Sequence, residues 1–226
     1  MKVVSWNCRG CFRDKCSNTF ALNADIYVIQ ECENPDKYPT SFAELPFDYV
    51  WQGEHDNKGL AIFISRKLSY TINEWPAYCL RHFISLRIND IFDLVGVWAG
   101  PPYIEEYYIY QSINIDKYSN NTILIGDFNS NAVWDKEHRS RNHSAVVMQL
   151  QNVGIVSAYH YVTGEKHGFE SQPTFFLYKH RDKPYHIDYC FLNPDQLRSF
   201  KLLDNNIWIE LSDHLPLLVE VDIAKE

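Results

Sequence analysis

A carboxylate and a carboxamide follow a short apolar run in the segment ILIGDFNSN, residues 123–131. Asp127 and Asn129 supply these groups, and the preceding Gly126 is expected to let a substrate approach the backbone closely. Similar residues end or interrupt four other apolar runs: Asn7, Glu31, Asp188 and the pair Asp213–His214. One Asn or Asp after a strand is usually a turn former. Because ligands of α/β proteins collect outside strand ends, the whole set predicts one active site.

Oxygen donors without thiolates favour a hard cation at that site. Asn7, Glu31 and Asp213 offer an amide and two carboxylates. Mg²⁺ is usually held by one or two carboxylates together with water and substrate phosphate. These three residues are therefore the predicted Mg²⁺ ligands.

Asp188 interrupts an apolar run, between Ile187 and Tyr189, in a segment that is expected to be buried. A buried carboxylate needs a hydrogen-bonding or charged partner. A histidine would serve, and it would in turn become an oriented base or acid. His214 is the predicted partner.

Short apolar runs bounded by Gly, Pro, Asn or Asp recur along the whole chain and have the length and composition of strands. Among them are TILIGD, HIDYCFL and NIWIEL. Residues 14–24, 103–118 and 142–153 read instead as helices. The pattern predicts an α/β architecture in which two sheets pack face to face with helices outside. No linker or repeat is evident, so residues 1–226 are expected to form a single domain.

Composition excludes some classes of protein. The net charge is −8, whereas a dedicated DNA-binding protein that is not an enzyme is usually basic. No signal peptide or run of about 18 apolar residues is evident, which predicts a cytoplasmic protein without a membrane partner. Three cysteines form a C-x2-C-x4-C motif at residues 8–16, but no second Cys/His pair lies nearby to complete a zinc site. Reduced thiols are expected instead.

The segments SWNCRG, QECE, GDFNSN, HIDYCFLN and SDHLPL, in this order, resemble the motifs of the exonuclease–endonuclease–phosphatase (DNase I-like) superfamily. They span residues 5 to 217, and they are most similar to those of abasic-site endonucleases. Each motif alone is weak, but five in the family order are a strong signal. The resemblance implies a four-layer α/β sandwich of two mixed sheets flanked by helices.

The resemblance also implies roles for individual residues. Asn7 and Glu31 would bind Mg²⁺ or Mn²⁺, and Asp213 would lie at the metal site. Asp127 would position or deprotonate the attacking water, and Asn129 would hold a phosphate oxygen or the nucleophile. A cation at such a site neutralises phosphate oxygens, and an aligned base permits in-line attack.

The remaining catalytic pair implied by the resemblance is His214 and Asp188. His214 would contact the scissile phosphate as acid, base or charge stabiliser, and Asp188 would orient its ring. One departure is the loop after the middle strand, where many relatives carry a further His or Tyr. Trp98 occupies that neighbourhood here and is either a core residue or a stacking wall for a base, while Tyr103 lies a few residues late.

Basic residues are needed along the phosphate track of a nucleic acid. Arg139 and Arg141, in the loop after GDFNSN, are the predicted phosphate-binding residues, although an ordinary solvated loop is an equal alternative.

Three functions remain open from the sequence. The first is a divalent-metal endonuclease or exonuclease acting on DNA or RNA. The second is a phosphatase or phosphodiesterase acting on a small phosphorylated metabolite. The third, a catalytically silent binding module, is disfavoured because the polar set is intact.

Overall fold

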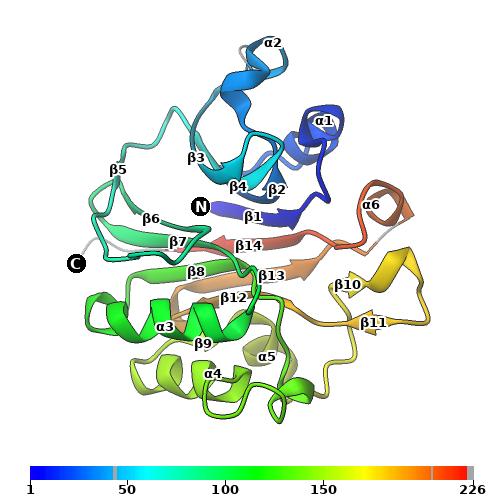
Figure 1. Cartoon of the computed structure of the whole chain (residues 1–226). Helices are drawn as coiled ribbons and strands as arrows, with labels where there is room; N and C mark the ends of the chain where they lie inside the picture. Colours follow the sequence, from blue (N-terminus) through cyan, green and yellow to red (C-terminus); the bar gives the residue numbers. More distant parts are fainter. Residues whose placement is uncertain (43–44, 205, 223–226) are drawn as a thin grey trace.

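The computed structural model describes residues 1–42, 45–204 and 206–222, and two six-stranded sheets form its centre (Figure 1). The first sheet has the strand order β13-β14-β1-β2-β4-β3. Its β1 and β2 are parallel, and the other neighbours are antiparallel. The bounds of its strands are β1 (Lys2–Asn7), β2 (Ile26–Cys32), β3 (Phe47–His55), β4 (Lys58–Ser65), β13 (Leu197–Leu202) and β14 (Leu217–Val221).

The second sheet has the order β5-β6-β7-β8-β12-β9, and only β7 and β8 are parallel. A separate antiparallel pair is formed by β10 (Phe175–Phe176) and β11 (Pro184–Tyr185). It lies beside His214, to which Phe175 bridges. The bounds of the second sheet are β5 (Tyr70–Ile72), β6 (Phe83–Ile88), β7 (Phe92–Trp98), β8 (Thr122–Asp127), β9 (Val156–Ser157) and β12 (Asp188–Leu192).

Aliphatic side chains from the facing sides of the two sheets form the central core. Val28 and Ile62 come from the first sheet, and Leu94 and Ile125 come from the second. Gly96 of β7 lies at a tightly packed point between the sheets, because a Cβ atom there would lie 2.9 Å from Cδ1 of Ile62 and 3.1 Å from Cγ1 of Val28. The spacing of the sheets is therefore set by tightly packed hydrocarbon.

Helices cover the two outer faces. Aromatic and aliphatic residues of α3 and α4 pack on the second sheet, and residues from α1, α2 and α6 pack on the first (Figure 1). Two sheets and two helical layers make the four-layer α/β sandwich, so the predicted fold is confirmed. The helices are α1 (Cys16–Phe20), α2 (Pro39–Phe42), α3 (Ile104–Asn114), α4 (His143–Asn152), α5 (Ala158–Thr163) and α6 (Asn206–Leu211).

One strand prediction was wrong. NIWIEL forms α6, in which Trp208 is buried with its ring centroid 5.2 Å from that of Trp6. Ile207 is exposed and Ile209 is half-buried, so Trp208 is the residue of this helix that packs into the core. The helix predicted over 14–24 is shorter than expected, because a 3₁₀ turn at Phe12–Asp14 precedes α1.

All six cysteines are free, and three of them are buried, as the prediction of reduced thiols requires. Within the described part of the chain, no helix combines the length and the apolar character needed to cross a membrane.

Candidate active site

Asp127 ends β8, a strand buried between β7 and β12, and its side chain is fully buried. The backbone amide of Asn129 donates to Oδ1 of Asp127 at 2.8 Å, and Nδ2 of Asn129 donates to Oδ2 at 3.0 Å. Gly126 serves a purpose other than the predicted one. A Cβ atom there would lie 1.9 Å from the carbonyl oxygen of Val97, so glycine permits close approach of β7 rather than of a substrate.

Asn7 and Glu31 approach Asp127 from the other sheet. Nδ2 of Asn7, at the end of β1, donates to Oδ2 of Asp127 at 2.9 Å and lies 3.4 Å from Oε1 of Glu31. Glu31 has a left-handed φ of 58°, at a register shift between Gln30 and Cys32. Such a bulge redirects a side chain at a strand end. The three side chains therefore meet across the space between the sheets.

His214 and Asp188 form the second part of the site. Nδ1 of His214 lies 2.9 Å from Oδ2 of Asp188, and both side chains are buried. Asp188 begins β12 and is paired in register with Asp127 on β8. The His214 backbone is anchored because its carbonyl accepts from Nε1 of Trp6 at 3.0 Å. Nε2 of His214 lies 4.0 Å from Oδ2 of Asp127, which is too long for a hydrogen bond.

Charge within this group shifts two pKa values. Burial and the neighbouring Asp188 carboxylate raise the pKa of Asp127, against the opposing effect of His214. Burial alone would lower the pKa of His214, but the charges of Asp188 and Asp127 outweigh it and raise this pKa to about 9. His214 is accordingly a cation at neutral pH, and Asp127 is a more basic carboxylate than usual.

Two basic side chains neutralise the outer carboxylates. Nζ of Lys58 lies 2.5 Å from Oε2 of Glu31, and Nε of Arg9 lies 3.3 Å from Oδ2 of Asp213. The backbone amide of Arg9 also donates to Oδ1 of Asn7 at 3.0 Å. Arg9 thus links two of the predicted metal ligands, Asn7 and Asp213.

The donor set fits a hard divalent cation. Glu31 offers a carboxylate beside the Asn7 amide, and Asp213 offers one that Arg9 links to Asn7. No sulfur or imidazole is among these three. Lys58 on Glu31 is consistent with this, because a carboxylate next to other carboxylates needs a cation.

An aromatic pocket of about 420 Å³ adjoins Asn129. The ring of Trp134 lies 5.0 Å from that of Tyr185, and Phe175, which also lines the pocket, lies 4.6 Å from the ring of His214. Flat apolar walls next to the catalytic groups suit a base or a sugar ring. The pocket is lined by Tyr103, Asn129, Trp134, Glu137, His138, Phe175, Leu177, Tyr185 and Ile187.

The three predicted substrate-binding residues lie differently. Trp98 is half-buried against the central core, pairs with Asp127 in register and contacts the His82 ring at 4.5 Å. Arg139 and Arg141 are exposed in the loop that also supplies Trp134 to the pocket. The structure thus brings the seven predicted catalytic and metal residues into two connected groups. It places Trp98 beside Asp127 in the sheet, and Arg139 and Arg141 on the exposed surface.

Sequence reasoning missed Lys58 and Phe175, and it gave Tyr103 little weight. Tyr103 precedes α3 with a φ of 61° and lines the aromatic pocket with Asn129. Tyr103 lies in the loop where this sequence departs from the family pattern, and that position was a signal by which it could have been identified. Lys58 and Phe175 had no such signal, because each reaches the site only through strand pairing: Lys58 begins β4 and Phe175 bridges to His214.

Comparison with known proteins supports these findings. The sequence profile of the Endonuclease/Exonuclease/phosphatase family matches residues 4–214. This range contains both groups of site residues described above. The sequence has no significant match among curated proteins.

Solved structures share the fold over nearly their whole length. A 3′-5′ exonuclease, NExo, from Neisseria meningitidis has a TM-score of 0.70 at 20% identity, with 98% of this chain and 100% of that chain covered. A 3′ phosphatase NExo from Neisseria bound to product DNA hairpin has 0.71 at 18%, covering 98% and 99%. An AP endonuclease from Archaeoglobus fulgidus has 0.71 at 16%, covering 99% and 100%. At these identities the likeness establishes the fold.

Proposed function

The chain belongs to the Endonuclease/Exonuclease/phosphatase family, and from this premise we propose that it hydrolyses phosphodiester bonds of DNA or RNA in a reaction that requires Mg²⁺, with Mn²⁺ as a substitute. Asn7, Glu31 and Asp213 would hold the cation, which neutralises charge on the phosphate oxygens when bound. We also propose a cytoplasmic location, which the six free cysteines support.

The observation that carries this proposal is the position of His214 opposite Asp127. Their nearest side-chain atoms are 4.0 Å apart, and each is held by a separate hydrogen bond, to Asp188 and to Asn7 respectively. Asp127, with its raised pKa, orients and deprotonates a water molecule. Cationic His214 stabilises negative charge as it develops on the phosphoryl oxygens.

The nucleic acid is favoured over a smaller substrate by the aromatic pocket beside Asn129. Its Trp134, Tyr185 and Phe175 walls match a nucleobase or a deoxyribose next to the reacting phosphate. Arg9 and Lys58 would contact flanking phosphates, with Arg139 and Arg141 further along the strand. The DNA hairpin bound to the Neisseria 3′ phosphatase gives a precedent for nucleic acid on this fold.

A terminal phosphate is a second candidate substrate. One structural neighbour is described as a 3′ phosphatase bound to product DNA hairpin. The net charge of −8 disfavours binding of long polyanions, but it gives no preference for small phosphates. A small phosphorylated metabolite would fit the same catalytic groups, but it would leave most of the aromatic wall uncovered.

One experiment separates these outcomes. The protein is incubated with supercoiled plasmid, single-stranded DNA, RNA, a duplex bearing an abasic site, a duplex bearing a 3′-phosphate and inositol phosphates, each with Mg²⁺, Mn²⁺ or chelator. Strand cleavage that chelator and Asp127→Asn both abolish supports a nuclease. Release of phosphate from the small esters alone would refute the nucleic acid assignment, and inactivity on every substrate would refute the enzyme.

A further inference from the structure

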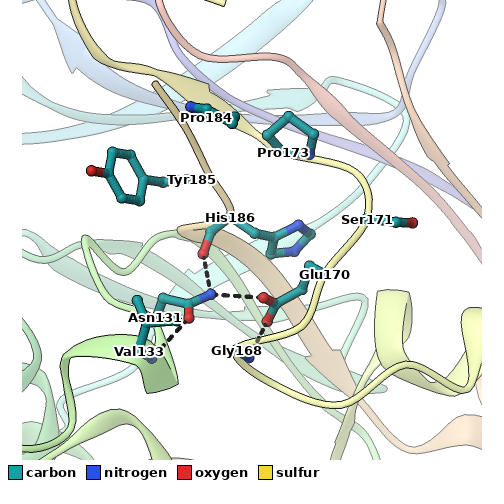
Figure 2. A pocket seen from close by; sticks show the side chains of 9 residues that line it. All are labelled: Asn131, Val133, Gly168, Glu170, Ser171, Pro173, Pro184, Tyr185 and His186. Carbon is teal, nitrogen blue, oxygen red and sulfur yellow. Dashed lines mark hydrogen bonds between the residues drawn. The ribbon is translucent and has the colours of Figure 1, made fainter. Parts of the chain in front are cut away.

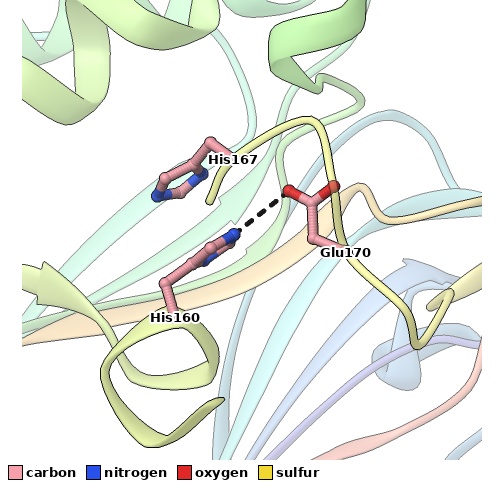
Figure 3. Close-up of side chains that lie close together, drawn as sticks. All are labelled: His160, His167 and Glu170. Carbon is pink, nitrogen blue, oxygen red and sulfur yellow. Dashed lines mark hydrogen bonds and ion pairs between the residues drawn. The ribbon is translucent and has the colours of Figure 1, made fainter. Parts of the chain in front are cut away.

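A second group of potential metal ligands lies in and after α5. One ligand atom from each of His160, His167 and Glu170 lies within 4.8 Å of the other two. Figure 3 shows the two imidazole rings stacked, with their centroids 3.5 Å apart, and the Glu170 carboxylate beside them. Two imidazoles and one carboxylate are a frequent ligand set for zinc, which prefers nitrogen ligands far more than Mg²⁺ does.

The neighbouring residues orient these ligands. Nδ1 of His160 lies 2.8 Å from the hydroxyl of Ser157, and its Nε2 lies 3.1 Å from Oε1 of Glu170. With the proton on Nδ1, the lone pair of Nε2 can bind a metal that Glu170 also binds. The other oxygen of Glu170 accepts from Nδ2 of Asn131 at 3.0 Å. Ligating histidines and carboxylates in metal proteins are held by such outer hydrogen bonds.

Two buried histidines next to the group have an unsatisfied nitrogen atom. Nδ1 of His143 and Nε2 of His186 are buried, and neither has a hydrogen-bond partner among the described residues. Buried polar atoms without a partner often mark an absent water or ion. His186 and Glu170 both line a cavity of about 180 Å³ (Figure 2). Nε2 of His143 lies 2.9 Å from Nδ1 of His167, so a further imidazole adjoins the ligand group.

We propose that His160, His167 and Glu170 form a structural site for a divalent transition metal of the zinc class, separate from the catalytic cation. The metal would join α5 to the segment that follows it. That segment leads to Thr174, whose hydroxyl accepts from the backbone amide of Asp188 at 3.0 Å.

The proposed site also connects with the catalytic loop. Asn131, two residues after Asn129, donates to Glu170 and to the carbonyl oxygen of His186 at 2.9 Å (Figure 2). His186 in turn lies two residues before Asp188. A metal that fixes Glu170 would therefore hold both segments that carry catalytic side chains.

The test measures binding of Zn²⁺ and Co²⁺ chlorides to the purified, chelator-treated full chain. Isothermal titration gives affinity and stoichiometry, and the visible absorption of bound Co²⁺ reports nitrogen ligands. His167→Asn and Glu170→Gln are expected to weaken Zn²⁺ binding at this site by at least about 10-fold and to remove the Co²⁺ absorption. Millimolar Mg²⁺ should not displace the metal, and Zn²⁺ should raise the melting temperature of the wild-type chain.

Two controls keep the result decisive. Glu31→Gln alters the catalytic cation site and should leave the Co²⁺ absorption intact, as should His180→Asn, which changes an exposed histidine. Circular dichroism checks that each variant is folded, and His160→Asn replaces any variant that is not. Unchanged Zn²⁺ affinity in the folded triad variants, or loss of all binding in Glu31→Gln, would overturn the proposal.

Discussion

Nδ1 of His214 lies 2.9 Å from Oδ2 of Asp188, although 26 residues separate the two in the chain. Both are buried, so the ion pair is little screened by solvent. The backbone around them is also held: the amide of Asp188 donates to Thr174, and the carbonyl of His214 accepts from Trp6. The pair is therefore a fixed unit, and its two members should act together.

Asp188→Asn is expected to lower kcat nearly as much as His214→Ala, by roughly 100- to 10,000-fold. The reason is that the uncharged amide no longer stabilises the imidazolium. The double variant should be little worse than either single variant. Steady-state kinetics on the preferred substrate measures all three. Asp48→Asn, which alters an exposed carboxylate paired with Arg66, is the control, and losses that multiply in the double variant would show independent action.

The pH dependence of the reaction should carry the same signature. The pKa of His214 is raised to about 9, so its cationic form persists through neutral pH and the alkaline fall in rate should begin as pH approaches that value. Asp188→Asn removes a charge that raises this pKa, and the alkaline fall should therefore move to lower pH. Rate profiles from pH 6 to 10, together with NMR titration of the His214 ring in the wild-type chain and in Asp188→Asn, measure the shift. An alkaline limb at the same pH in both proteins would contradict this account.

Lys58→Met should increase the apparent affinity for Mg²⁺ by several-fold. Nζ of Lys58 lies 2.5 Å from Oε2 of Glu31, so the ammonium competes with the cation for the carboxylate. The measurement is the Mg²⁺ concentration that gives half-maximal activity, or direct titration by calorimetry. Lys37→Met is a matched control, because it removes an exposed ammonium that pairs with Asp56 instead. An equal change in both variants would mean that only overall charge matters.

The histidine group should make the fold sensitive to acid. Burial lowers the pKa values of His143, His167 and His186. Below the ordinary value of about 6.5 the unfolded chain binds protons that the folded chain does not, so the free energy of unfolding decreases as pH falls from that value towards 3.

Urea denaturation at pH 7.5, 6.5, 5.5 and 4.5, with chelator present, measures this slope. Each such proton contributes up to about 1.4 kcal/mol per pH unit. His167→Asn should make the slope smaller by about one proton, whereas His180→Asn should leave it unchanged. A slope that His167→Asn does not alter would show that this ring is not held neutral in the folded state.

The layered fold and the grouping of polar strand ends could be predicted from the sequence. Strand composition and turn residues are local signals, and the residues of TILIGD and HIDYCFL form strands as expected. The strand prediction for NIWIEL failed because six residues carry too little periodicity to separate a strand from a short helix. Only the contact of Trp208 with Trp6, distant in the chain, reveals which it is.

The electrostatic partners could not be predicted in the same way. Lys58 reaches Glu31 because β4 pairs antiparallel with β2, and this register is a property of the sheet rather than of either segment. The histidine group had a weak local signal, since His160, His167 and Glu170 lie within eleven residues. His143 and His186 join it only through the packing of α4 and the segment before β12.

Asn7 and Asp127 lie on opposite sheets, and at Gly96 the side chains of Ile62 and Val28 leave no room for a Cβ atom between those sheets. The packing of the hydrocarbon core between the sheets consequently sets the distance between Asn7 and Asp127. A stabilising redesign that adds side-chain volume at Gly96 would push the sheets apart and lengthen the contact between Asp127 and Asn7 by tenths of an ångström. Selection for catalytic rate should therefore limit substitutions of core residues that never contact the substrate.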